Sequence, residues 1–403
     1  MSTPAMTDRA GRLDPLAYLA IELAALRQQG LARTIRVIEG EQIARAHIDG
    51  REVVNLSSNN YLGLTTHPLL RERARDAIDR YGVGSGAVRT IAGTMAIHVE
   101  LERRLAEFKQ TEAVVVFQSG FTANAGTVSS ILTKDDVVIS DELNHASIID
   151  GCRLSRADIK VYAHRDVGAA RKILESLPAS QRKLLITDGV FSMDGDLAPL
   201  PDLCGLAEEF GCIMMVDDAH ASGVFGRNGR GTIDHFDVHG RVDVQVDTLS
   251  KAVGVLGGYV AGSRTLIDYL RQKARPFLFS TSHPPPVAAA CLAALDVLLE
   301  EPQLIKRLWE NTRFFQAGLQ RLGFDTGCSE SPITPVIVGD GVLATNLSNG
   351  LFDEGVFAQA IAFPTVARGR ARVRTIVTAT HTMDQLQFAL DAFSRVGARL
   401  GIR

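Results

Sequence analysis

Short apolar runs alternate with helical patterns along most of the chain, from about residue 50 to residue 290. The apolar runs have the length of strands, whereas the segments between them place apolar side chains at helical spacing. This alternation is typical of a mainly parallel sheet covered by helices on both faces. We therefore predict an α/β fold with strands at residues 113–117, 137–140, 184–187, 213–216, 242–246 and 259–262.

Two changes in the pattern divide the chain. An amphipathic segment at residues 16–26 is too short to form a domain, and three prolines at 284–286 interrupt the chain before a long helical pattern at 287–299. We predict an N-terminal arm at residues 1–49, a large domain at 50–290 and a smaller α+β domain at 291–403.

Composition limits the classes of protein that fit. With 403 residues and 46% hydrophobic content, the chain can form one large domain or two moderate ones around a substantial core. The net charge of −3 gives no electrostatic reason to expect nucleic acid or a membrane as a partner. The odd number of cysteines and the absence of an apolar signal core argue against secretion, and residues 287–299 are shorter than the roughly 20 residues of a membrane span. We expect a cytoplasmic protein.

Lys251 is the first candidate for chemistry. It follows the predicted strand at 242–246, comes after Thr248 and Ser250, and precedes a glycine-rich run. A lysine at a strand end among small residues can reach a pocket and form an imine with an aldehyde. Taken alone, a lysine on the protein surface is the commoner case.

A second candidate site lies upstream, where the apolar run at 213–216 ends in Asp217, Asp218 and, after one alanine, His220. Ligands of open α/β sheets bind at the carboxyl ends of the strands. An aspartate there can pair with a protonated ring nitrogen, and His220 can reach a neighbouring ring oxygen. Together with an imine lysine, this is the pairing that pyridoxal 5'-phosphate (PLP) requires.

Two other interpretations compete at these positions, and a third concerns a separate glycine-rich segment. Asp217 or Asp218 can serve as a helix N-cap, or Asp217 and His220 can bind a metal, although no further ligand cluster supports a metal site. The segment from Gly82 to Ala87 fits the glycine-rich dinucleotide fingerprint, but it follows a charged helical pattern instead of a strand. We therefore reject nicotinamide binding.

Nine segments in order resemble the α-oxoamine synthases, fold-type I PLP enzymes that join an amino acid to an acyl-CoA. Those that carry the resemblance include Leu56-Ser-Ser-Asn59-Asn-Tyr, Gln118-Ser-Gly-Phe121-Thr-Ala-Asn, Asp217-Asp-Ala-His220 and Thr248-Leu-Ser-Lys251. The resemblance covers nearly the whole chain and implies a large PLP-binding domain with a mainly parallel sheet, followed by the smaller domain.

The resemblance implies a cofactor site in which Lys251 holds PLP as an imine and Asp217 pairs with the ring nitrogen. The matching family histidine stacks on the ring, which assigns that role to His145. Gly120 and Phe121, at the start of a predicted helix, match the phosphate-binding pair, in keeping with the free amides of a helix N-terminus. The remaining cofactor residues that it implies are Ser192, His220 and Thr248, and also Ser280 and Thr281 from the neighbouring subunit of a homodimer.

Substrate residues follow in the same way. Arg372 and Arg374 alternate along a predicted strand and so share one face, and a guanidinium binds a carboxylate in bidentate geometry. The family uses the second arginine of this motif for the amino-acid carboxylate, so we assign it to Arg374; a solvated strand face is the alternative. Further substrate-contacting positions are Asn59, His145, Thr365 and, on a loose match, Arg33.

Within this family, the sequence resembles most the glycine C-acetyltransferases and the related 8-amino-7-oxononanoate synthases. We expect glycine and acetyl-CoA as substrates. The alternatives are alanine with a pimeloyl thioester in biotin synthesis, serine with a long acyl chain, and glycine with succinyl-CoA. A catalytically dead partner subunit, a PLP-dependent transcription regulator and an aminotransferase fit less well, because the lysine is present, the N-terminal segment is too short to bind DNA, and the motifs differ from those of aminotransferases.

The chain departs from the family pattern at Asp247, where glycine is usual, and at Ala87, where glycine or serine is commoner. An extra charge beside Thr248 weakens phosphate binding unless it points away or is paired.

Overall fold

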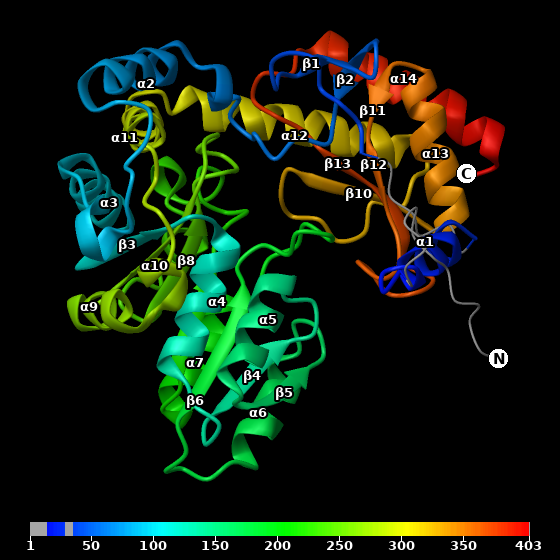
Figure 1. Ribbon diagram of the computed structural model, residues 1–403. Helices are drawn as coiled ribbons and strands as arrows, with labels where there is room; N and C mark the ends of the chain where they lie inside the picture. Colours follow the sequence, from blue (N-terminus) through cyan, green and yellow to red (C-terminus); the bar gives the residue numbers. More distant parts are fainter. Residues whose placement is uncertain (1–13, 29–34, 403) are drawn as a thin grey trace.

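The computed structural model describes residues 14–28 and 35–402 and shows a large α/β unit beside a smaller one that contains the C-terminal segment (Figure 1). The helices are α1 (Tyr18–Gln28), α2 (Pro68–Tyr81), α3 (Ala96–Lys109), α4 (Gly120–Ile131), α5 (Ala146–Ser155), α6 (Val167–Glu175), α7 (Leu200–Phe210), α8 (Thr232–His235), α9 (Arg264–Lys273), α10 (Arg275–Leu278), α11 (Pro285–Glu300), α12 (Gln303–Arg321), α13 (Gly341–Asp353) and α14 (Met383–Leu400).

The large unit is built on a seven-stranded sheet with the order β3-β9-β8-β7-β6-β4-β5. Neighbouring strands run parallel from β8 to β5, whereas β9 is antiparallel to both β3 and β8. The mainly parallel sheet predicted from the sequence is confirmed. Its strands are β3 (Ala113–Phe117), β4 (Val137–Asp141), β5 (Asp158–Tyr162), β6 (Lys183–Asp188), β7 (Ile213–Asp217), β8 (Val244–Thr248) and β9 (Gly258–Gly262).

Helices cover both faces of this sheet, and the alternation of side chains along each strand divides the core into layers. On β3, Val115 and Phe117 pack with residues of α4, α5 and α9, whereas Val114 and Val116 pack with residues of α3 and α11 on the other face. The six predicted strands correspond to strands of this sheet, with ends that differ by at most two residues. The edge strand β5 was missed because charged and exposed residues interrupt its apolar pattern.

A second, smaller unit holds the C-terminal segment. Its sheet has the order β10-β13-β12 and packs against α12, α13 and α14 through a core that includes Phe315, Val373 and Phe393. A further sheet, β1-β2-β11, joins residues 45–55 to this C-terminal unit. The strands of these two sheets are β1 (Arg45–Ile48), β2 (Arg51–Asn55), β10 (Ile333–Gly339), β11 (Val356–Phe357), β12 (Gln359–Ile361) and β13 (Ala371–Ile376).

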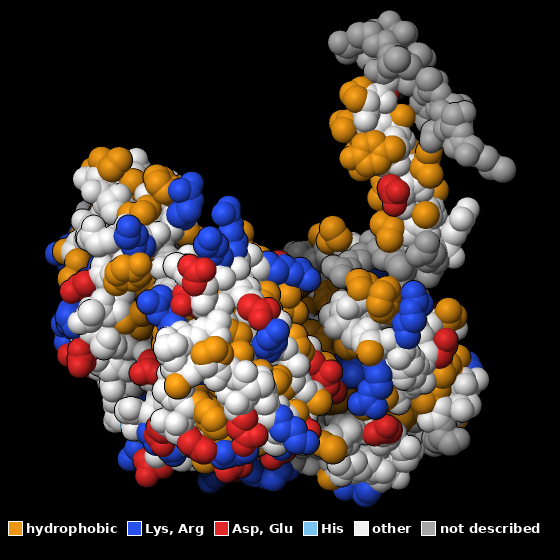
Figure 2. Space-filling model, turned by 90° about the horizontal axis from the view of Figure 1, so that it is seen from below, with side chains coloured by type: hydrophobic (Ala, Val, Ile, Leu, Met, Phe, Trp, Pro, Cys, Tyr) orange, Lys and Arg blue, Asp and Glu red, His pale blue; other side chains and the backbone are white. Residues whose placement is uncertain are grey.

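The predicted domain boundaries stay predictions, although two observations bear on them. Helix α11 runs across the proposed division at residue 290 and packs on α2 and α3. Helix α1 has no buried residue, and Figure 2 shows an apolar segment that projects from the body of the molecule. In the described part of the chain, no helix combines the length and the apolar character needed to cross a membrane.

His164 links two acidic side chains beside the sheet. Its Nδ1 lies 3.0 Å from Asp141 Oδ1, and its Nε2 lies 2.9 Å from Asp196 Oδ2. Burial lowers the pKa of His164, but hydrogen bonds and charge interactions with the two carboxylates outweigh burial and raise it to about 9. Since the pKa of histidine in the unfolded chain is about 6.5, the stabilisation is complete below that pH and is lost as pH rises through about 9.

We therefore predict that His164→Gln lowers the free energy of unfolding by about 1–3 kcal/mol at pH 6, with a difference from the unsubstituted protein that shrinks between pH 6.5 and pH 9. Urea unfolding across this pH range measures the difference. His47→Gln, on the exposed face of β1, is the control. A difference that does not change with pH would contradict a role for the histidine charge.

Candidate active site

Two predicted site residues, Asp217 and Thr248, lie at the carboxyl ends of neighbouring parallel strands, beside Asp188 of a third strand. Asp188 ends β6, Asp217 ends β7 and Thr248 ends β8. The register places Asp188 opposite Asp217, and Asp217 opposite Val246. Because strands in a parallel sheet end at a common edge, residues 29 to 31 positions apart along the chain form one site.

Asp217 is buried and held in a fixed orientation. Its Oδ2 accepts a hydrogen bond of 2.6 Å from Asn124 Nδ2, and its Oδ1 accepts one of 2.9 Å from the Ala219 amide. The other proton of Asn124 Nδ2 goes to Ser147 Oγ at 2.9 Å. Sequence reasoning assigned no role to Asn124, although it is the last residue of a segment that carries the family resemblance, Gln118-Ser-Gly-Phe121-Thr-Ala-Asn.

Lys251 lies just beyond β8 and is partly buried. Burial lowers the pKa of its amine, while the carboxylates of Asp217, Asp247 and Asp188 partly offset this effect. A lowered pKa increases the fraction of neutral amine, which is the form that attacks an aldehyde. Because the charge of Asp217 affects this pKa, Lys251 and Asp217 lie within electrostatic reach of each other.

Both predicted histidines are held next to these groups. His145 caps α5, its Nδ1 lies 2.7 Å from Ser147 Oγ, and its amide donates to Asp188 Oδ2 at 2.7 Å. Burial lowers the pKa of His145 against the opposing effect of Asp217. Burial, followed by the charge of Asp217, raises the pKa of Asp188 well above its ordinary value.

His220 is buried, and its Nδ1 lies 2.7 Å from the Tyr61 hydroxyl. Burial lowers the pKa of His220 well below its ordinary value, and the charges of Lys251 and Arg374 lower it further. A neutral His220 that carries its proton on Nε2 accepts a hydrogen bond through Nδ1, and the Tyr61 hydroxyl is its donor. Sequence reasoning missed Tyr61, because nothing in the spacing of residues 159 positions apart indicates a contact.

The two arginines of β13 have different environments. Arg372 donates through Nη1 to Met193 O at 2.8 Å and to Asp194 Oδ1 at 2.7 Å, so its guanidinium is engaged. Arg374 donates through Nη2 to Asn59 Oδ1 at 2.9 Å, but its buried Nε has no hydrogen-bond partner among the described residues. A buried, unpaired guanidinium N–H fits an incoming carboxylate.

The first turn of α4 closes the opposite end of the site. Gly120 packs against Thr248, whose Oγ1 lies 2.7 Å from Ser250 Oγ. A side chain at Gly258 would bring a Cβ to within 2.4 Å of the Gly120 amide nitrogen, so only glycine allows this close approach. Free amides of a helix N-terminus beside two hydroxyls fit the phosphate of PLP. With Asp217 and Lys251, the residues present fit the whole cofactor.

The remaining predicted residues lie in less enclosed places. Ser192 is partly buried next to Phe191, and Thr365 is exposed in the loop after β12. Ser280 is partly buried and Thr281 is exposed on the segment after α10. Arg33 lies outside the described residues, so the structure does not place it.

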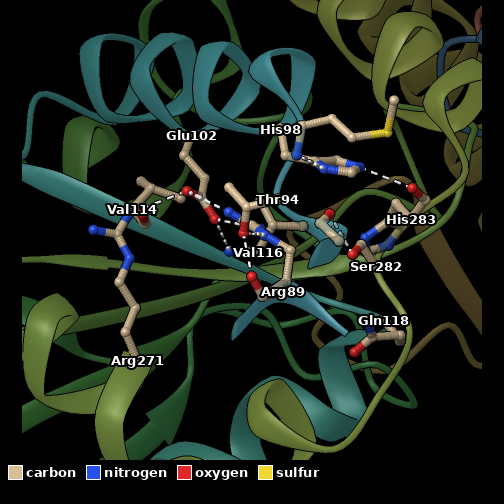
Figure 3. Close-up of polar contacts among 12 residues, drawn as sticks. Arg89, Thr94, His98, Glu102, Val114, Val116, Gln118, Arg271, Ser282 and His283 are labelled. Carbon is tan, nitrogen blue, oxygen red and sulfur yellow. Dashed lines mark hydrogen bonds and ion pairs between the residues drawn. The ribbon is translucent and has the colours of Figure 1, made fainter. Parts of the chain in front are cut away.

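Hydrogen bonds anchor the segment that carries Thr281, and Figure 3 shows one of them, between His98 Nε2 and His283 O at 2.8 Å. Gln118 Nε2 donates to Thr281 O at 2.7 Å, and Ser282 Oγ donates to Gly93 O at 2.6 Å. Arg89, two residues after the Gly82–Ala87 segment that fits the dinucleotide fingerprint, pairs with Glu102 at 2.8 Å in the interior. That segment follows α2, as the rejection of nicotinamide binding requires.

Comparison with known proteins agrees with this geometry. The family model of class I and II aminotransferases matches residues 51–393. The 8-amino-7-oxononanoate synthase of Symbiobacterium thermophilum is 62% identical over 96% of this chain and 98% of its own, and that of Thermoanaerobacter pseudethanolicus is 56% identical over the same shares. A variant of serine palmitoyltransferase from S. paucimobilis, solved with a bound PLP–myriocin aldimine, superposes with a TM-score of 0.92 at 32% identity, over 97% of this chain and 100% of that one.

The chain therefore belongs to the class I and II aminotransferase family and has the fold of a fold-type I PLP transferase. Within it, the chain is an α-oxoamine synthase, a PLP-dependent acyltransferase. Residues 14–28 and 35–402 contain no group of three or more His, Cys, Asp or Glu side chains arranged to hold a metal ion.

We predict that Lys251→Ala abolishes both turnover and covalent attachment of PLP, because alanine has no amine that could form an imine with the PLP aldehyde. Mass spectrometry after borohydride reduction measures the attachment. Lys160→Ala, an exposed lysine paired with Asp158 on β5, is the control and should retain both. Full turnover by the Lys251 variant would contradict the assignment.

Proposed function

We propose that the protein is an 8-amino-7-oxononanoate synthase, which condenses alanine with a pimeloyl thioester and releases the thiol carrier and CO2. The observation that carries this proposal is the 62% identity to an enzyme of that name over almost the full length of both chains. The sequence had favoured glycine and acetyl-CoA, with this reaction as the alternative. The relatives support the alternative better than that first expectation.

PLP, when bound, supplies an electron sink for the negative charge that develops at the amino-acid Cα. Asp217 is oriented by Asn124 and the Ala219 amide, so its carboxylate is fixed where it can keep the ring nitrogen protonated. We assign to His145 the position over the ring, since its side chain is held at the start of α5 within electrostatic reach of Asp217 and Lys251.

In this proposal Arg374 binds the carboxylate of the amino acid. The hydrogen bond with Asn59 holds the guanidinium, and its Nε has no partner among the described residues. Arg374 and Lys251 both lie within electrostatic reach of His220, because their charges lower its pKa. A carboxylate held there fixes the direction of the Cα–H bond. The amine of Lys251, with its lowered pKa, then removes the Cα proton, and the carbon nucleophile attacks the thioester carbonyl.

We also propose that the active enzyme is a homodimer that shares its sites. Large apolar side chains are exposed around the phosphate end of the site and on the segments next to it: Val83, Ile91, Phe121, Leu256 and Phe279. A second copy of the chain is the occupant that would bury them. Thr281, which is exposed two residues beyond Phe279, is available to such a partner.

The substrates are tested by measuring release of CoA from acetyl-, succinyl-, pimeloyl- and palmitoyl-CoA with glycine, alanine and serine. We expect the highest kcat/KM for alanine with pimeloyl-CoA and formation of 8-amino-7-oxononanoate, seen by mass spectrometry. A preference for glycine with acetyl-CoA would overturn the proposal in favour of glycine C-acetyltransferase.

The role of Arg374 yields a separate prediction. Arg374→Lys keeps the positive charge but removes bidentate binding, so we expect KM for the amino acid to rise about tenfold or more, with little change in KM for the acyl thioester. Steady-state kinetics with each substrate varied in turn measures this. Arg395→Lys, on the exposed face of α14, is the control. Equal increases in both KM values would refute a specific contact with the carboxylate.

A further inference from the structure

Behind the proposed phosphate site lies a buried group of charged side chains that the reaction does not use. Lys109, the last residue of α3, has its Nζ 3.2 Å from Asp247 Oδ2 and 3.5 Å from Asp218 Oδ2. All three side chains are essentially inaccessible to solvent, with exposures of 1% for the lysine and 0% for each aspartate.

This group is fully connected by hydrogen bonds. Lys109 Nζ also donates to Arg230 O at 2.6 Å and to Ser222 Oγ at 3.3 Å. Asp247 Oδ2 accepts hydrogen bonds from the hydroxyls of Ser222 and Tyr259, the latter at 3.1 Å. Such complete pairing offsets the cost of burying a charge and gives each side chain one fixed position.

The charge of the group is nevertheless unbalanced, because one lysine faces two aspartates. Burial is the main cause that raises the pKa of Asp218 and that raises the pKa of Asp247 to about 6, and Lys109 opposes the shift in both. At pH 8 Asp247 is therefore ionised. If Lys109 lost its charge, two carboxylates would remain without a cation in the interior.

Asp247 connects this group directly to the phosphate site. Its Oδ1 accepts a 2.7 Å hydrogen bond from the amide of Thr248, and Thr248 packs against Gly120 at the start of α4. If Gly120 and Thr248 bind the phosphate, only Thr248 separates the phosphate from the carboxylate of Asp247. Two negative charges in a medium of low dielectric constant repel each other, and a cation beside one of them offsets this repulsion.

We propose that Lys109 is a positioning residue for the cofactor phosphate: it neutralises Asp247 and keeps that carboxylate on the Thr248 amide. The proposal rests on the assignment of Gly120 and Thr248 to the phosphate. It accounts for the aspartate at a position where the family usually has glycine, since the charge that threatens phosphate binding is paired within the chain.

The test compares binding of PLP and of pyridoxal, which lacks the phosphate, to apoprotein at pH 8. Lys109→Met should raise the Kd for PLP about tenfold or more while the Kd for pyridoxal changes less than about twofold. Lys109→Met/Asp247→Asn should restore PLP binding to within about threefold of the unsubstituted protein. A purely structural role would shift both ligands by the same factor and would give additive effects.

Asp247→Asn alone provides a measurement that does not depend on the stability of the lysine variant. It keeps an acceptor for the Thr248 amide and removes the negative charge, so PLP binding should be unchanged or tighter. Weaker binding of PLP relative to pyridoxal in this variant would overturn the proposal. Glu102→Gln, which breaks another buried ion pair of α3 (Figure 3), is the control and should affect both ligands alike.

Thr248→Ala tests the underlying assignment separately. Loss of PLP binding without loss of pyridoxal binding would support Thr248 as a phosphate residue. If both ligands weaken equally, that assignment fails, and the proposal for Lys109 fails with it. If Thr248→Ala is selective for PLP and Lys109→Met is not, only the proposal for Lys109 is overturned.

Discussion

The buried carboxylate of Asp217 is the constraint on which the site depends. Asn124 and the Ala219 amide donate hydrogen bonds to it, and Lys251 lies within electrostatic reach. The positions of Asn124 and Lys251 depend on the parallel sheet. Strand β7 ends at the aspartate, β8 ends three residues before the lysine, and Asn124 lies on α4, which follows β3. The fold therefore creates the charge pattern before any ligand binds.

Around this carboxylate, burial shifts the pKa values of several other titratable groups toward their neutral forms. His145 and His220 have lowered pKa values, and Asp188 has a raised one, each with burial as the main cause. The side chains proposed to contact the ligand come from separate elements: Asp217 from β7, Lys251 from the segment after β8 and Arg374 from β13. In a site of low dielectric constant, such separation lets each charge act on one part of a ligand.

The sequence predicted those features of the structure that depend on residues close together along the chain. Strand β3 was predicted with its exact bounds because burial on both faces makes residues 113–117 continuously apolar, whereas the exposed edge strand β5 gave no such pattern. Site residues within short motifs were found for the same reason. Asn124, Tyr61 and Lys109 escaped assignment since each acts through a contact between residues 93 to 159 positions apart.

The substrate side of the site requires both units of the structure. Arg374 comes from the C-terminal sheet and Asn59 from the segment after β2, which itself pairs with β11. Asp217 and Lys251 come from the large sheet. Arg372, paired with Asp194 of the large unit, ties the same strand β13 to that sheet. One strand therefore carries two arginines in different environments: Arg372 is engaged by Met193 O and Asp194 of the large unit, whereas Arg374 keeps a buried Nε without a partner among the described residues, which we propose receives a carboxylate.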